Sequence, residues 1–291
     1  MIHDRIALII SKYTEHDMIS RHTGLPAFPE LRIRLLDACL DDSGHPDSIR
    51  DLYASVVALI QIGLDTHDQI DTDPSPPSER QMRSRQLNVL GGDYFSSRFY
   101  HLLAQAGEIE MIRQLSEAVC EANRLKMDLY SRMQAHRLTA EEYIAYRASI
   151  KAELFRGFAV YMVEPIAEIW EGLLESLATC ETIAEESRRC LSEETIRCSW
   201  AYWHIQQSGT EEDRRLLDEH TGVNGSSPSA ASILEKYSIH QQLTDMLERH
   251  IGQLAALFKQ LKGMKRADEL NGIAAALLQA TSEPALHSEM R

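Results

Sequence analysis

The residues whose types and spacing could do chemistry form a short polar run, His67-Asp68-Gln69-Ile70-Asp71, which follows an apolar segment. Carboxylates three positions apart on a helix lie on one face, where they can share Mg²⁺ ions with a diphosphate. A full Asp-Asp-x-x-Asp set has lost its second and fifth carboxylates here, because Gln69 and Thr72 occupy those positions. An amide oxygen brings no charge, and Mg²⁺ prefers carboxylate and phosphate oxygens. The run therefore predicts a diphosphate site with part of its charge missing.

Apolar residues spaced three or four apart predict the helices that would position this run. One helix is expected from Asp47 onward, and the prolines at 74–77 must end it. Its face is marked by Leu52, Val56, Leu59, Gly63 and His67. A second helix is expected over 79–105, where Gly91-Gly92 would let a neighbouring helix approach closely. Thr139 and Glu142 form a capping box that starts the helix carrying Lys151.

Further helical segments are expected over 165–207 with an interruption, over 230–261 and over 267–280. The stretch 221–229 is predicted to be a loop, and Ser227-Pro228 to begin the next helix. Asp41-Asp42 is interpreted as a linker, and Glu211-Glu212-Asp213 as the charged first turn of a helix. No clear strand pattern is present. These patterns predict an all-α protein of about ten helices in a single domain over 1–291, with N-terminal helices (1–45), a core bundle (46–220), a loop (221–229) and C-terminal helices (230–291).

Composition limits the class of protein. Among 291 residues, 44% are hydrophobic and 25% are charged, which argues against disorder. A net charge of −14 argues against nucleic acid or an anionic membrane as a partner, although it leaves room for a phosphorylated substrate. The first five residues carry charges and lack the apolar run of a signal peptide, and no stretch is long enough to cross a membrane. Five scattered cysteines predict reduced thiols in a cytoplasmic protein.

Three segments resemble motifs of the trans-prenyl diphosphate synthase family. Ser55 to Asp68 resembles the helix leading into the first Asp-rich motif, 90–95 resembles a later Leu-x-Gly-Asp-Tyr-Leu segment, and 150–155 resembles a Lys-Thr-Ala-x-Leu-Phe motif without its threonine. More narrowly, residues 64–68 together with 85–95 are similar to component I, the small subunit of two-component bacterial heptaprenyl diphosphate synthases. The resemblance implies a helical isoprenoid-synthase fold and a cytoplasmic, bacterial protein.

The departures from that pattern concern catalysis. Beyond Lys151 the aspartates are Asp213, Asp218, Asp245 and Asp268, and no two are adjacent, so the second Asp-rich motif of the catalytic enzymes is missing. The Arg-Arg-Gly that follows the first motif is missing as well. Metal-assisted departure of pyrophosphate needs carboxylates from two facing helices. With no catalytic residues and no metal site of its own, the chain is expected to be inactive alone.

The resemblance implies a regulatory subunit that activates a catalytic component II in polyprenyl chain elongation for menaquinone side chains. The partner would hold Mg²⁺ and act on allylic and isopentenyl diphosphates. Without the partner the chain is expected to form a homodimer or to behave poorly.

The same resemblance assigns candidate sites. A vestigial diphosphate site would comprise His67, Asp68, Gln69, Asp71 and Lys151. Tunnel or packing positions would be Gly63, Leu64, Gly91, Gly92, Asp93 and Tyr94, and the lack of bulky aromatic residues at Gly63 and Leu64 would leave room for a growing prenyl chain. The alternatives for Asp68 and Asp71 are an exposed acidic helix end or metal binding by this chain alone. For His67 the alternative is a hydrogen-bonded interior histidine, and for Lys151 a solvated surface lysine.

Two other functions remain open from the residues alone. One is a helical prenyl-binding or scaffold protein without an enzymatic partner. The other is a metal-dependent phosphohydrolase built on the His67-Asp68 dipeptide, to which His22, His101 and His136 could contribute.

Overall fold

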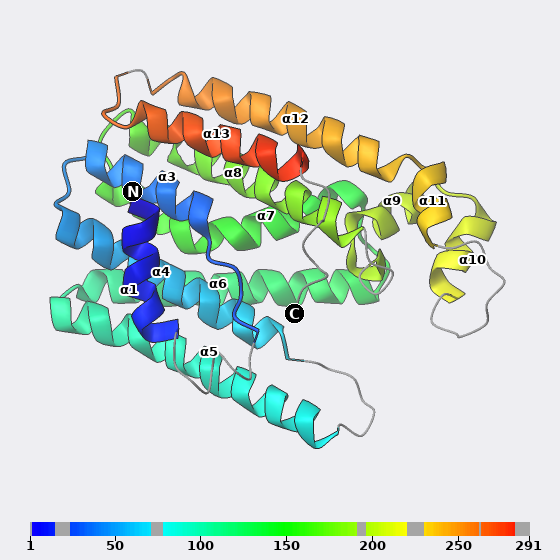
Figure 1. The fold of residues 1–291 in the computed structure, drawn as a ribbon, viewed down its shortest axis with the longest axis horizontal. Coiled ribbons are helices and arrows are strands. Elements are labelled where there is room, and N and C mark those ends of the chain that lie inside the picture. Colours follow the sequence, from blue (N-terminus) through cyan, green and yellow to red (C-terminus); the bar gives the residue numbers. More distant parts are fainter. Residues whose placement is uncertain are drawn as a thin grey trace. The chain divides into compact units, whose positions relative to one another are not determined.

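The computed structural model describes residues 2–14, 24–70, 78–190, 196–219, 230–261 and 263–282. The described parts contain helices and no strand, so the predicted all-α class is confirmed (Figure 1). Within the described residues there are twelve α-helices, where the sequence predicted about ten: α1 (Ile2–Thr14), α3 (Glu30–Asp42), α4 (Asp47–Asp68), α5 (Glu79–Ala106), α6 (Ile109–Gln134), α7 (Ala140–Arg156), α8 (Ile166–Arg189), α9 (Trp200–Ser208), α10 (Glu211–Glu219), α11 (Ala230–Lys236), α12 (Ile239–Phe258) and α13 (Ala267–Ser282). Two short 3₁₀ turns, η1 (Gly157–Tyr161) and η2 (Ile196–Cys198), precede α8 and α9.

The helix starts follow local capping chemistry. Thr139 begins α7 as predicted: its backbone N–H donates to Glu142 Oε2 at 2.9 Å, and Glu142 N donates to Thr139 Oγ1 at 3.0 Å. Ser78 and Gln81 form a second capping box at the start of α5. Helix α5 ends at Gly107, whose φ of 76° is a left-handed conformation that glycine adopts without steric cost. Local sequence thus sets both ends of α5.

Some boundaries differ from the sequence predictions. The helix expected over 230–261 is broken at Tyr237-Ser238 into α11 and α12, where Ser238 has a φ of 48°. No glycine or proline marks this break, so the sequence pattern misses it. Asp41 and Asp42 are not a linker, because they form the last turn of α3. The predicted loop at 221–229 and the cap at Ser227-Pro228 lie outside the described residues.

The chain divides into two compact units. The first comprises 1–121, 154–168 and 264–269, and the second comprises 122–153, 169–263 and 270–291. That both form a single domain, as the sequence predicted, stays a prediction. In the described part of the chain, no helix combines the length and the apolar character needed to cross a membrane.

Helix α4 lies at the centre of the first unit. Every residue from Tyr53 to Leu64 is buried, as expected for a helix that is apolar on all sides. Helices α1, α3 and α5 pack against it. The contact with α5 is antiparallel, because Gly63 faces Phe95 and Ser96 whereas His67, one turn later, faces Gly92. This pairing brings the polar end of α4 beside the middle of α5.

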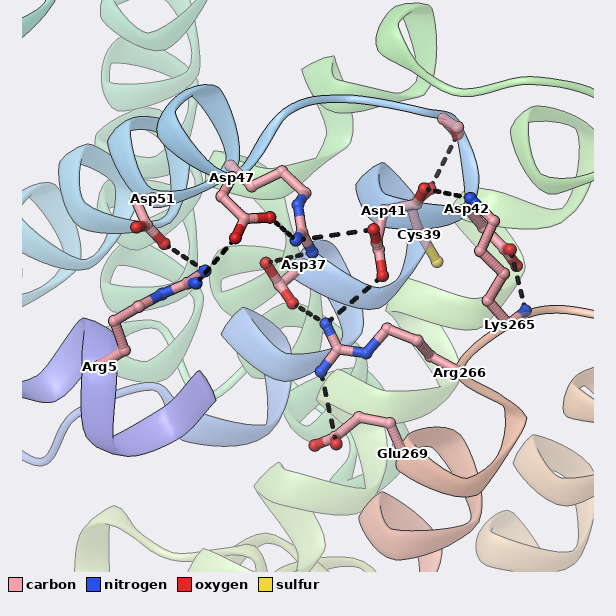
Figure 2. A network of polar contacts seen from close by, with 12 residues as sticks. Arg5, Asp37, Cys39, Asp41, Asp42, Asp47, Asp51, Lys265, Arg266 and Glu269 are labelled. Carbon is pink, nitrogen blue, oxygen red and sulfur yellow. Dashed lines mark hydrogen bonds and ion pairs between the residues drawn. The ribbon is translucent and has the colours of Figure 1, made fainter. Parts of the chain in front are cut away.

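A network of buried charges joins α3, α4 and the start of α13 within the first unit (Figure 2). The Asp37 side chain is fully buried and accepts from Arg50 at 3.0 Å and from Arg266. Burial raises the pKa of Asp37, although both arginines oppose that rise. Asp41 lies 3.6 Å from Arg50, and Asp42 accepts from the backbone N–H of Lys265 at 3.0 Å. The acidic end of α3 is therefore a structural anchor.

In the second unit the largest buried side chains belong to α7, α8 and α9. Tyr143 and Trp170 are almost fully buried, and Trp200, Tyr202 and Trp203 are buried on α9. Beyond α9, Asp213 accepts hydrogen bonds from Thr210, Lys236 and Tyr237, and these contacts hold the pKa of that carboxyl far below its usual range. The predicted capping role of the Asp213 turn is confirmed by the 3.3 Å bond from Asp213 N to Thr210 Oγ1.

Candidate functional site

The predicted diphosphate run lies at the C-terminal end of α4. Asp68 is its last residue and Gln69 its C-cap, and both are exposed. The chain leaves the helix there through bonds from Gln69 N to Thr66 O and from Ile70 N to His67 O, which close a tighter final turn. Helix α4 ends at Asp68, and the expectation that Asp68 and Asp71 share a face stays a prediction. Asp71 itself lies outside the described residues.

Glycines carry the contact between α4 and α5. A Cβ built on Gly92 would lie 2.5 Å from Nε2 of His67, and a Cβ on Gly63 would lie 3.2 Å from the carbonyl oxygen of Gly92. Both distances are shorter than ordinary contacts to a Cβ, so a side chain at Gly63 would push the helix backbones apart and one at Gly92 would displace the His67 ring or the helix. The sequence expectation of close packing at Gly92 therefore agrees with the geometry.

Gly63 and Leu64 are both buried, and Gly63 packs against α5. Their proposed contribution to a prenyl tunnel stays a prediction. Gly91 is buried in the same contact region of α5.

His67 occupies the rim of this contact. Its Nε2 lies 3.5 Å from Oδ1 of Asp93, whose side chain is 66% exposed. Tyr94 is half-buried, with its ring 5.6 Å from that of Phe95. His67 is thus a partly buried residue beside a carboxylate, which agrees with the interior interpretation more than with a free metal ligand. Asp68 and Asp93 are the exposed carboxylates of this region.

A series of polar contacts next to the predicted diphosphate run was not predicted from the sequence. The Gln61 side chain donates to Asp65 at 2.8 Å and accepts from buried Arg32 at 3.0 Å. The Arg32 guanidinium in turn lies 5.3 Å from the centre of the Phe155 ring, a cation–π distance. A glutamine on the buried face of an otherwise apolar helix was the available signal, because a buried amide needs partners.

Lys151 belongs to the second unit and lies on α7. Its Nζ donates to Oε1 of Glu185 on α8 at 2.6 Å, and its side chain is only 16% exposed. Arg147, one turn earlier on α7, donates to Oε2 of the same carboxylate at 3.3 Å. The expected diphosphate ligand is therefore not a solvated surface lysine, because a carboxylate of this chain holds it.

Glu186, adjacent to Glu185, is fully buried. It accepts from the hydroxyl of Tyr143 at 3.1 Å and from the backbone N–H of Trp200 at 2.6 Å. Arg147 and Arg189 lie 3.6 and 3.5 Å from it. A carboxylate at the N-terminus of α9 satisfies a helix donor and interacts favourably with the helix dipole.

The sequence signal for this cluster was the spacing of Tyr143, Arg147 and Lys151, which places them on one face of α7. Combined with the adjacent glutamates on α8, this spacing could have suggested an ionic contact between the two helices. The cluster was not predicted because all of its residues except Lys151 lie outside the motif at 150–155.

Helix α9 lies some tens of residues beyond Lys151, where the sequence comparison expected a second acidic helix. It carries Trp200, Tyr202, Trp203 and His204 instead. The rings of Trp200 and His204 stack, with centroids 4.7 Å apart. Within the described ranges, no three His, Cys, Asp or Glu side chains are grouped so as to hold a metal ion. His101 and His136, nominated for a phosphohydrolase site, are both exposed, and His22 lies outside the described residues.

Comparison with protein families agrees with the resemblance that the sequence motifs indicated. The family described as heptaprenyl diphosphate synthase (HEPPP synthase) subunit 1 matches residues 16–221, well over half of the 291 residues. The chain belongs to this family. The resemblance to component I drawn from residues 64–68 and 85–95 is thereby confirmed.

Individual relatives agree with this membership. Over 126 residues the chain is 35% identical to heptaprenyl diphosphate synthase component 1 of Geobacillus stearothermophilus. The aligned part is 43% of this chain and 54% of that protein, so the chain spans about half the length of the curated relative it matches.

Solved structures agree on the fold. A geranylgeranyl pyrophosphate synthase from Corynebacterium glutamicum matches with a TM-score of 0.69 at 15% identity, covering 96% of this chain and 91% of the other. A decaprenyl diphosphate synthase from Rhodobacter capsulatus matches with a TM-score of 0.65 at 14% identity, covering 95% and 98%. At such identities the likeness shows the all-α isoprenyl diphosphate synthase fold alone.

Proposed function

We propose that this member of the subunit 1 family is the non-catalytic, regulatory subunit of a two-component heptaprenyl diphosphate synthase. It binds a catalytic component II and activates that partner for polyprenyl chain elongation, which supplies the side chain of menaquinone. The substrates in the complex are allylic and isopentenyl diphosphates. The name of the Geobacillus relative, component 1 of a synthase, supports the existence of a second component.

One observation carries the non-catalytic part of the proposal: the aspartates beyond Lys151 form no paired motif. In addition, Asp213 accepts from Thr210, Lys236 and Tyr237, and Asp245 accepts from Gln241 at 2.6 Å. These carboxylates are engaged within the chain. Ionisation of an allylic diphosphate needs carboxylate-held metal on both sides of the leaving group, and Asp68 and Asp93 cannot supply both.

The residues present do not fit Mg²⁺. Mg²⁺ takes oxygen ligands in nearly octahedral geometry and is held through carboxylates and phosphate oxygens. At the end of α4 the position next to Asp68 is an uncharged Gln69, and Asp93 lies beside His67. We therefore assign Mg²⁺ binding to the catalytic partner. All five cysteines are free thiols, as in cytoplasmic proteins, and the proposal includes the bacterial cytoplasm as location.

Co-expression with a candidate catalytic component tests the proposal. The two chains should co-purify as a heterodimer, and prenyl transfer from isopentenyl diphosphate should require both. Gln69→Asp in the isolated chain should restore no activity, because one added carboxylate does not replace a second cluster. Turnover by the isolated wild-type chain would contradict the non-catalytic assignment. Failure of the two chains to associate would favour the prenyl-binding or scaffold alternative.

A further inference from the structure

The contact between Lys151 and Glu185 has a chemical consequence that goes beyond the loss of catalytic residues. On α7, Arg147 and Lys151 are one turn apart, so their side chains lie next to each other on one face. Both donate to the two oxygens of a single carboxylate, at 3.3 and 2.6 Å. Two adjacent cations that converge on paired anionic oxygens form an arrangement that also suits a phosphate group.

We propose that Glu185 is an internal anion that occupies the Arg147–Lys151 cation pair and thereby blocks diphosphate binding on α7. The inference rests on the proposed function, because it explains how a non-catalytic subunit keeps the lysine of the motif and yet does not take up a diphosphate through it. The contact is autoinhibitory: a diphosphate must displace the carboxylate before it can reach the Lys151 ammonium.

The register of α8 keeps this internal anion in place. Glu186, the next residue, is fully buried and holds the first backbone N–H of α9 at 2.6 Å. Tyr143 and Arg147 contact Glu186 from α7. Because Glu186 is fixed on both sides, Glu185 is presented to Lys151 at a high effective concentration, and a ligand from solution competes against an intramolecular partner.

Accessibility leaves room for that competition. The side chains of Lys151 and Glu185 are 16% and 32% exposed, so the pair borders solvent and is not sealed in the core. A partly exposed ion pair of this kind contributes modestly to stability, so its removal should leave the fold intact. Glu185 can therefore be changed without the penalty that changing buried Glu186 would bring.

The experiment measures binding of inorganic pyrophosphate to the whole chain by isothermal titration calorimetry in metal-free buffer. Glu185→Gln keeps the shape of the side chain and removes its charge. It should bind pyrophosphate up to about fivefold more tightly than wild type, the upper end of the range expected from releasing one partly exposed ion pair. Glu171→Gln makes the same change on an exposed part of α8 and serves as the matched control, which should bind like wild type.

A second substitution assigns the effect to Lys151. Adding Lys151→Ala to Glu185→Gln should remove the gain, since the anion would lose its closest cation. Equal binding by wild type and Glu185→Gln, no measurable binding by either, or a gain that survives Lys151→Ala would each overturn the inference. Co-purification with the catalytic component is an independent measurement, so a failure here is distinguishable from a failure of the proposed function.

Discussion

At the contact between α4 and α5, glycines bring the two helices together and the polar groups stay at the rim. At the contact between α7 and α8, charged side chains gather in the interior: Glu186 is fully buried, and Arg147 and Lys151 are largely covered. In the first region an uncharged Gln69 stands where the Asp-rich motif has a carboxylate. The second region keeps the lysine of its motif and pairs it with Glu185. The first region thus differs from the motif in its charge, and the second in the partner of its charge.

The buried charge cluster of the second region should give the largest effect on stability. Glu186→Ala removes the acceptor of Trp200 N and the buried counter-charge of Arg147 and Arg189. Removing one member of a buried ion pair costs about 3–5 kcal/mol. Chemical denaturation followed by circular dichroism measures the loss. Glu185 is the partly exposed neighbour of Glu186, and Glu185→Ala should cost less than about 1 kcal/mol. Equal losses for the two variants would contradict the distinction between buried and bordering charges.

The glycine contact of the first region should come next. Gly92→Leu places a branched side chain where even a Cβ would lie 2.5 Å from the His67 ring, so the ring must move away or the helices must separate. Overpacking of this kind costs about 1–3 kcal/mol. Size-exclusion chromatography with light scattering and pull-down of the catalytic component would show whether partner binding is lost as well.

Gly172→Ala on α8 is the matched control for that substitution. Its Cβ meets nothing within 4 Å, and alanine favours a helix, so this variant should be more stable than wild type by up to about 1 kcal/mol. If Gly92→Leu leaves stability and partner binding unchanged, Gly92 is not a close-packing position.

Substitutions in the two capping boxes should lower stability less than the changes above, and the two boxes should differ in their effect. Thr139→Ala and Ser78→Ala each remove a side-chain acceptor at a helix N-terminus, at a typical cost of about 1 kcal/mol. Helix α7 buries Ala140 and Tyr143 in its first turn, whereas residues 78–83 at the start of α5 are all exposed. Thr139→Ala should therefore lower global stability, while Ser78→Ala should mainly increase amide hydrogen exchange in the first turn of α5. The reverse pattern would mean that the start of α5 is the more constrained of the two.

The dependence of stability on pH should give the smallest signal. Burial lowers the pKa of His204 below its ordinary value of 6.5, so folding favours the neutral form of this imidazole. The unfolded chain binds the proton more readily, and stability is therefore lost as pH falls through about 6.5. His204→Phe keeps a ring against Trp200 and should reduce that loss. Thermal melts at pH 5 and pH 7 provide the measurement, and an unchanged pH dependence would remove His204 from the explanation.

The parts of the fold that the sequence predicted are those determined by local sequence signals. Apolar spacing and capping residues located α4, α5 and α7 to within a few residues, because a helix start depends on neighbours in the sequence. The break at Ser238 has no such marker. The sequence also did not predict that α4 ends at Asp68.

The candidate site was predictable only as a set of positions. The motifs identified His67, Asp68 and Lys151, but not the partners that determine their chemistry. Glu185 lies 34 positions from Lys151, and no local pattern links the two. Gly92 was predicted to be a packing position, but only the structure shows that the His67 side chain occupies the space a Cβ on Gly92 would need.

The charge network of the first unit sets the order in which the protein can be completed during synthesis. Arg266, which binds Asp37, lies 229 positions beyond it along the chain (Figure 2). Glu269, which accepts from Arg34, lies 235 positions beyond Arg34. A ribosome adding about 5–20 residues per second needs about 10–50 s to cover that interval. During this time the buried carboxylate of Asp37 has Arg50 as counter-charge but not Arg266. The N-terminal helices therefore reach their final electrostatic state only after residues 266–269 have been translated.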